Sequence, residues 1–337
     1  MRQPDFRNIQ KVLRKERPDR PTLFEFFLNG PLYRKLAGPR WNEGTSLADE
    51  FRRLAFAFAA AGYDYATVRG SPFGFPRRDQ RRAQTVSLNE CAVVTDRKSF
   101  DACGWTDPQE SDYAALDEVA ADLPRGMKLM VCGPGGVLEN VIRMAGYDNL
   151  CLLLADDPAL AADLFEAVGA RLVRHYACAV RHRSVGIVMS NDDWGFKTQP
   201  MLSPADMRKY VFPWHQRIVE TAHRAGLPAV LHSCGNQSEL MEDIVTRLGY
   251  DGKHSFEDAI EPIEAAYARY GGRIALLGGI DLDFLLRASC EDVRARSAAM
   301  LAAAGKGGYA LGTGNSVPEY IPDDKYFAMT SAALNPA

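Results

Sequence analysis

The sequence has no long hydrophobic run, no surplus of charge of either sign and no regular cysteine framework. No apolar stretch approaches the ~18 residues that a membrane-spanning helix needs, and the N-terminus has no apolar signal-peptide core. A formal net charge of −3 gives no general attraction to nucleic acid or anionic membranes. The seven cysteines are scattered and odd in number, which argues for reduced thiols. We therefore expect a cytoplasmic protein that binds neither nucleic acid nor membrane.

What the sequence does contain is an alternation of short apolar runs with longer segments of helical spacing. The helical segments include 47–61, 109–123, 137–145, 158–181, 204–225, 238–248, 260–270, 290–304 and 322–334. The strand candidates are 21–28, 63–68, 128–132, 185–189, 227–232, 250–254, 273–277 and 309–312.

Strands that alternate with helices over 337 residues, with no shift in composition, favour one α/β domain spanning residues 1–337. The number of strand candidates favours a (β/α)8 TIM barrel. A doubly wound open sheet has the same local units, and it stays open as an alternative.

The segment 71–108, after the second strand candidate, is interpreted as an insertion within the barrel domain. It contains turn residues and the apolar piece Cys91–Val94, which allows a β-hairpin. It also contains a basic run, for which a solvated loop face is favoured over a phosphate or partner contact. That run consists of Arg77, Arg78, Arg81 and Arg82.

The stretch Val230–Asn236 places an imidazole and a thiol where a buried strand opens into a loop. Leu227–Leu231 is apolar, His232 ends the run and Cys234 lies two residues further on. In parallel α/β proteins, this end of a strand is where sites are built. A borderline nitrogen and a soft sulfur are a pair that suits zinc, although a buried core cysteine beside a histidine is the plain structural alternative.

Polar residues follow the other strand candidates in the same way, although helix caps, turns and ion pairs would explain many of them singly. We assign Asp193, Glu257 and His254 to catalysis, Glu25, Arg69, Asp281 and Asn315 to substrate binding, and His232 and Cys234 to a metal.

Three of these assignments rest on local spacing. Asp192 and Asp193 are adjacent and are expected to point to different sides. His254 and Glu257 lie three apart, so they could touch if a helical turn begins there, with the carboxylate orienting the imidazole. Asp281 follows two glycines that let the backbone approach a ligand closely.

In these stretches the chain resembles the uroporphyrinogen decarboxylase-like superfamily. The resemblance covers most of the length and is best over residues 192–329. It rests on Asp192–Gly195, Leu202–Pro204, Leu231–Asn236, Leu277–Asp281, Gly312–Asn315 and Ile321–Pro322. The resemblance implies a (β/α)8 barrel and one of two chemistries. One is cofactor-free decarboxylation of uroporphyrinogen; the other is zinc-dependent methyl transfer to or from a corrinoid protein.

The departures from the decarboxylase pattern argue against uroporphyrinogen as the substrate. The N-terminal stretch Leu23–Leu28 lacks the Met-Arg-Gln-Ala-Gly-Arg-Tyr motif that supplies an essential arginine in those enzymes. The position of their catalytic tyrosine falls near Asn140, and that of the histidine in their last-strand motif falls on Thr313.

The methyltransferases of the superfamily bind zinc through His-x-Cys and a later cysteine. His232 and Cys234 match the first pair, but the later position falls at or next to Asn315. Asparagine is a poor zinc ligand compared with a thiolate, so another group would have to complete the site. The groups considered are Asp193, Glu25, His254 and, less favoured, Cys290.

The leading hypothesis is a metal-assisted methyltransferase that acts on a small molecule, with zinc as candidate cofactor and a corrinoid protein as candidate partner. The alternative is a cofactor-free decarboxylase of a carboxylated small molecule, in which Arg69 holds a carboxylate and Asp193 or Asp281 donates a proton. A non-catalytic binding protein on the same barrel is the third reading. A homodimer is the default expectation for a soluble enzyme.

Overall fold

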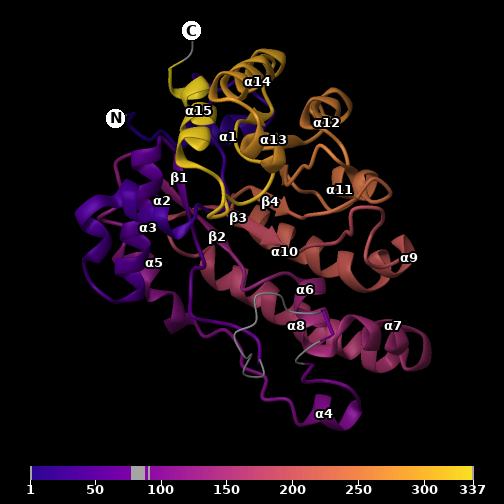
Figure 1. Cartoon of the computed structure of the whole chain (residues 1–337). Coiled ribbons are helices and arrows are strands. Elements are labelled where there is room, and N and C mark those ends of the chain that lie inside the picture. The colour runs from indigo at the N-terminus through magenta and orange to yellow at the C-terminus, as the bar shows by residue number, and fades with distance from the viewer. Residues whose placement is uncertain (1, 77–87, 90–91, 336–337) are drawn as a thin grey trace.

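Seven parallel strands form one curled sheet in the computed structural model, which describes residues 2–76, 88–89 and 92–335 (Figure 1). Their order in the sheet is the order of the chain. The strands are β1 (Tyr65–Val68), β2 (Lys128–Cys132), β3 (Val185–Asn191), β4 (Ala229–His232), β5 (Gly252–His254), β6 (Ala275–Leu277) and β7 (Tyr309–Ala310). A doubly wound sheet reverses its strand order, so the sequential order excludes that alternative.

The first predicted strand, 21–28, is represented by a single parallel bridge between Leu23 and Leu311, beside β7. Phe24 donates its N–H to the Leu311 carbonyl at 2.8 Å. On the other side, the Tyr65 hydroxyl in β1 bonds both backbone groups of Glu25, at 2.7 and 2.8 Å. A side chain therefore joins this segment to β1, and closure into an eight-stranded barrel stays a prediction.

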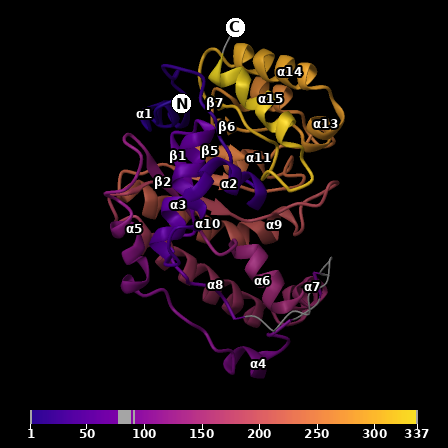
Figure 2. The same ribbon diagram turned by 60° about the vertical axis from the view of Figure 1, so that its left-hand side comes forward.

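Helices cover the outside of the sheet (Figure 1), and α1 lies near β7 (Figure 2). They are α1 (Arg7–Leu13), α2 (Gly30–Ala37), α3 (Leu47–Ala61), α4 (Arg97–Asp101), α5 (Ala114–Glu118), α6 (Val137–Ala145), α7 (Tyr147–Asp156), α8 (Pro158–Ala179), α9 (Pro204–Asp206), α10 (Phe212–Arg224), α11 (Met241–Thr246), α12 (Ile263–Tyr270), α13 (Leu282–Arg287), α14 (Cys290–Ala303) and α15 (Asp323–Leu334). Short 3-10 turns lie at Gly38–Asn42 and Glu110–Tyr113, and a π-helical turn at Met207–Val211.

Local capping signals explain why the predicted bounds of one helix agree with the structure. Helix α3 has the predicted bounds because the Ser46 and Asp49 side chains form a capping box at its start. Gly62, with φ of +94°, ends it. The helix predicted over 109–123 is instead a 3-10 turn followed by the short α5.

The predicted insertion is described only in part. Within 71–108, the structure shows α4 and backbone bonds from Val93 and Val94 to the Met144 carbonyl, at 2.8 and 2.9 Å. The basic run at 77–82 and Cys91 lie outside the described residues. The interpretation of 71–108 as an insertion, and of 1–337 as a single domain, stays a prediction. Among the described residues, no helix is long and apolar enough to cross a membrane.

Candidate metal centre

The carboxyl ends of three neighbouring strands lie side by side at the centre of the candidate site. The register pairs Asn191 of β3 with His232 of β4, and His232 with His254 of β5. Cys234 follows in the loop after β4, and Asp193 follows in the loop after β3. The parallel sheet therefore gathers side chains from two loops and two strand ends at one place.

A close contact between the two loops brings Asp193 to Cys234. Gly235 has φ of +84°, and a Cβ there would lie 2.0 Å from the carbonyl oxygen of Gly195. Gly195 donates its N–H to the Cys234 carbonyl at 3.2 Å. Only glycine combines that backbone conformation with such a close approach, so the glycine after the cysteine is part of the site's construction.

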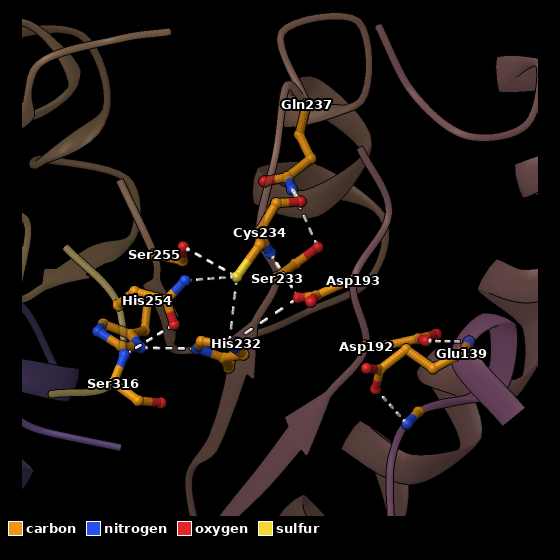
Figure 3. A network of polar contacts seen from close by, with 12 residues as sticks. Glu139, Asp192, Asp193, His232, Ser233, Cys234, Gln237, His254, Ser255 and Ser316 are labelled. Carbon is orange, nitrogen blue, oxygen red and sulfur yellow. Dashed lines mark hydrogen bonds and ion pairs between the residues drawn. The ribbon is translucent and has the colours of Figure 1, made fainter. Parts of the chain in front are cut away.

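Asp193, His232 and Cys234 place one carboxylate oxygen, one imidazole nitrogen and one sulfur within 4.8 Å of one another (Figure 3). His232 Nε2 lies 3.5 Å from Cys234 Sγ and 3.9 Å from Asp193 Oδ1. Tetrahedral zinc, with bonds of about 2.0–2.3 Å, holds its ligand atoms about 3.3–3.8 Å apart. The set fits zinc with small adjustments, and three protein ligands with one open position are typical of catalytic sites.

Asn315 lies next to the sulfur, where the resemblance places the later cysteine ligand. Its Nδ2 donates to Cys234 Sγ at 3.1 Å, while its Oδ1 accepts the Ser316 N–H at 2.7 Å and so orients the amide. Ser255 also donates to Sγ, at 3.4 Å. Burial raises the pKa of the Cys234 thiol well above its usual range, and the nearby Asp193 raises it further. The two donors act against burial by stabilising negative charge on sulfur.

Asp193, His232 and Cys234 are called the metal group below. Of the residues considered as a further ligand, only Asp193 belongs to it. His254 is buried behind His232, and Glu25 is fully buried with its two oxygens bonded by the Thr313 N–H and hydroxyl, each at 2.7 Å. Cys290 begins α14 and contacts Asp324 at 3.4 Å. Glu25, which we assigned to substrate binding, therefore holds the Thr313 loop in this structure.

Burial dominates the protonation of these groups. It raises the pKa of Glu25 to about 8 and lowers that of His254 to about 3. It also lowers the pKa of His232 well below its usual value, and it raises the pKa of Asp193. The two imidazoles are therefore neutral near pH 7, which is the form that ligates metals.

The adjacent aspartates point in different directions (Figure 3). Asp192 contacts the start of α6 and His215 instead of the metal group. Its oxygens accept the N–H groups of Leu138 and Glu139 at the start of α6, at 2.9 and 2.8 Å. His215 Nε2 contacts Asp192 Oδ2 at 2.9 Å, with both side chains fully buried. Sequence reasoning missed Glu139, whose pKa burial raises to about 8.

We predict that neutralising the two aspartates separates stability from metal binding. Asp192→Asn is expected to lower the free energy of unfolding by about 3 kcal/mol, because a buried charge-assisted network loses one partner. Asp193 Oδ1 accepts the Cys234 N–H at 2.8 Å, and Asp193→Asn keeps an oxygen for that bond. Its stability should therefore change by less than about 1 kcal/mol, while zinc affinity falls. Urea unfolding and zinc titration of both variants measure this; equal stability losses in the two would contradict it.

Three further predicted residues line one cavity of about 720 Å³ next to the metal group: Glu257, Asp281 and Asn315. Asp281 also accepts the Phe284 N–H at 3.0 Å and so caps α13. The proposed contact of Glu257 with His254 is not formed. No helical turn contains both residues, because Ser255 between them has φ of +84°. The turn that follows β5 begins at Glu257 itself, whose carbonyl accepts the Glu261 N–H at 2.9 Å. Glu257 instead faces this cavity and a second one of about 240 Å³.

Arg69 is exposed at the end of β1, and no ion pair to it is found within residues 2–76, 88–89 and 92–335. Sequence reasoning missed Lys253, a fully buried cation whose Nζ donates to the Ser255 carbonyl at 2.6 Å. Burial lowers its pKa to about 8. A lysine next to His254 in a short strand was the only signal, and lysines are usually exposed.

The parallel sheet carries this donor set at its carboxyl edge, so the structure defines an α/β fold with a candidate metal centre. Residues 113–335 match the family model described as uroporphyrinogen decarboxylase (URO-D). This match spans well over half of the chain, and the chain belongs to that family.

Two curated relatives share part of the sequence, and both are named uroporphyrinogen decarboxylase. The protein from Anaeromyxobacter dehalogenans (strain 2CP-C) is 28% identical over 188 residues, which is 56% of this chain and 51% of that protein. The protein from Anaeromyxobacter sp. (strain Fw109-5) is 29% identical over 131 residues, 39% and 36% of the two chains. The matches thus span about half or less of each relative's length.

Solved structures share the fold over nearly the whole chain at low identity. A methyltransferase from Methanosarcina mazei superposes with a TM-score of 0.70 and 15% identity, over 98% of both chains. A B12-independent methionine synthase from Shewanella sp. W3-18-1 superposes with a TM-score of 0.55 and 14% identity, over 93% of this chain and 96% of the other. At these identities the likeness shows the fold alone.

Proposed function

We propose that this chain is a metal-assisted methyltransferase that moves a methyl group between a small molecule and a corrinoid protein or thiol. The observation that carries the proposal is the juxtaposition of Asp193, His232 and Cys234, with ligand atoms within 4.8 Å. A nitrogen, a sulfur and an oxygen favour zinc over magnesium or calcium, which prefer oxygen ligands alone. The fold shared with the methyltransferase from Methanosarcina mazei is consistent with this proposal.

In this proposal His232, Cys234 and Asp193 would hold zinc, and the ion would also bind the substrate. Zinc bound there would lower the pKa of a substrate thiol or hydroxyl and make it a better nucleophile at neutral pH. Asn315 and Ser255 donate to the Cys234 sulfur, so they moderate the charge that the thiolate passes to the metal. Glu257 and Asp281 line the adjacent cavity, where they would contact a polar substrate.

A corrinoid protein is the proposed methyl carrier, on the basis of the superfamily resemblance. The proposal is tested first by the metal content of protein purified without chelator. We expect about one zinc per chain, in line with a single three-residue ligand set. A chain that carries no metal and does not bind added zinc would exclude metal-assisted transfer.

Metal removal separates this function from a cofactor-free reaction. Dialysis against a strong chelator is expected to abolish methyl transfer from methylcobalamin to a thiol, and zinc is expected to restore it. Magnesium is expected to fail, because a thiolate and an imidazole are poor ligands for a hard ion. The rate of methylcobalamin loss, followed by absorbance, is the measurement, with the untreated enzyme as control.

A second candidate is a cofactor-free decarboxylase of a carboxylated small molecule other than uroporphyrinogen. Exposed Arg69 at the end of β1 favours it, since this guanidinium has no carboxylate partner in the described part of the chain and could hold one from a substrate. The raised pKa of Asp193 suits a proton donor. This candidate predicts full activity in chelator and loss of activity in Arg69→Ala.

A further inference from the structure

A chain of buried side chains runs from His232 away from the metal group. His232 Nδ1 contacts His254 Nδ1 at 2.8 Å, and His254 Nε2 contacts the Thr313 carbonyl oxygen at 3.3 Å. Thr313 in turn donates its N–H and hydroxyl to Glu25. His254, Thr313 and Glu25 are fully buried, so water cannot replace any of these contacts.

The Thr313 carbonyl determines which ring nitrogens of His254 and His232 carry protons. A carbonyl oxygen only accepts hydrogen bonds, so His254 Nε2 must carry the proton that it donates to Thr313. In a neutral imidazole the other nitrogen then bears a lone pair, which makes His254 Nδ1 an acceptor. The bond between the two Nδ1 atoms therefore takes its proton from His232, and His232 Nε2 is left as a lone pair.

The surroundings exclude the charged alternative, in which His254 donates from both nitrogens. In residues 2–76, 88–89 and 92–335, no carboxylate contacts a ring nitrogen of His254. Its ring packs against Phe24, with centroids 5.0 Å apart. A buried imidazolium without a counter-charge is costly, so the neutral pair is the stable state.

We propose that His254 is a positioning residue that holds His232 as its Nδ1–H tautomer, with the lone pair of Nε2 directed at Cys234 Sγ and Asp193 Oδ1. This inference rests on the proposed function, because the directed lone pair serves a metal. A metal-ligating histidine commonly donates its second N–H to a carboxylate or carbonyl. Here a second histidine accepts that proton, and the Thr313 carbonyl fixes the tautomer of the acceptor. His232 Nε2 therefore has its lone pair free for a metal already in the metal-free protein.

Nitrogen-15 NMR of the metal-free protein tests the tautomers directly. With ring-labelled histidine, couplings to carbon-bound ring protons distinguish protonated nitrogens from those with lone pairs, and the His232 and His254 variants assign the signals. We expect Nδ1–H for His232 and Nε2–H for His254. An Nε2–H tautomer at His232 would overturn the proposal.

A matched pair of variants tests the consequence for metal binding. His254→Asn places an acceptor oxygen where Nδ1 lies. His254→Leu has the same branched shape as asparagine but no acceptor. Both variants lose the contact with the Thr313 carbonyl. Zinc affinity, measured by competition with an indicator, is expected to fall 10–100-fold in the leucine variant, and the asparagine variant should stay within about threefold of wild type.

Equal zinc affinity in the two variants would overturn the positioning role. The outcome that contradicts the proposed function is different, because it concerns the unaltered protein. If wild-type tautomers are as expected but wild type binds no zinc, the hydrogen-bond arrangement holds and the metal-dependent function fails.

Discussion

Cys234→Ser is expected to lose at least about 100-fold in zinc affinity and to abolish methyl transfer. Changing even an outer partner of a metal site costs up to about 100-fold, and here the ligand itself is replaced. A serine hydroxyl is harder and far less acidic than a thiol, so it rarely ligates zinc. Elemental analysis and the methylcobalamin assay measure the two effects.

Cys290→Ser is the matched control for this substitution. Cys290 is also partly buried and also bears a polar contact, to Asp324, but it lies outside the metal group. It should retain wild-type metal content and activity. Full activity in Cys234→Ser would exclude a metal role for the His-x-Cys stretch.

Gly235→Ala is expected to lower the free energy of unfolding by about 3 kcal/mol or more and to abolish zinc binding. A non-glycine residue in an unfavourable backbone conformation costs about 1–3 kcal/mol. The added Cβ would in addition lie 2.0 Å from the Gly195 carbonyl oxygen, which is backbone and cannot move independently. The two loops must separate, and Asp193 then moves away from Cys234. Urea unfolding followed by circular dichroism measures the stability.

Gly226→Ala separates the cost of the left-handed backbone conformation from the cost of the steric contact. Gly226 has φ of +72°, and a Cβ there meets nothing within 4 Å. It should therefore show only the cost of the left-handed conformation, about 1 kcal/mol, with zinc binding unchanged. If both variants lose the same stability, the loop contact contributes nothing and the close approach is not what joins Asp193 to Cys234.

Much of the arrangement was predictable because parallel strands are readable as short apolar runs. Strand β2 has the predicted bounds, and β4 and β5 end at the predicted histidines. Since the carboxyl ends of parallel strands lie at one edge, His232 and His254 were both assigned to the site, and the register pairs them directly.

What the sequence could not supply was the side on which each polar group lies. Glu257 was placed beside His254 by helical spacing, but the left-handed Ser255 turns the chain and sends Glu257 into a cavity. A serine gives no signal of that conformation, because non-glycine residues rarely adopt it. Glu25 was assigned to substrate binding, although a buried threonine almost 290 positions away donates hydrogen bonds to it. Such long-range pairing leaves no local pattern.

That pairing also determines when the centre can be completed. Thr313 and Glu25 are 288 positions apart, so their contact requires closure of almost the whole chain. During synthesis, the loop bearing Cys234 emerges long before residue 313 has been added. Until then, His254 has no carbonyl to set its protons, and His232 is free to exchange between tautomers. Under the proposed function, faithful metal loading would therefore be a late event in folding, since a nascent chain has the proposed ligands without the hydrogen bonds that orient them.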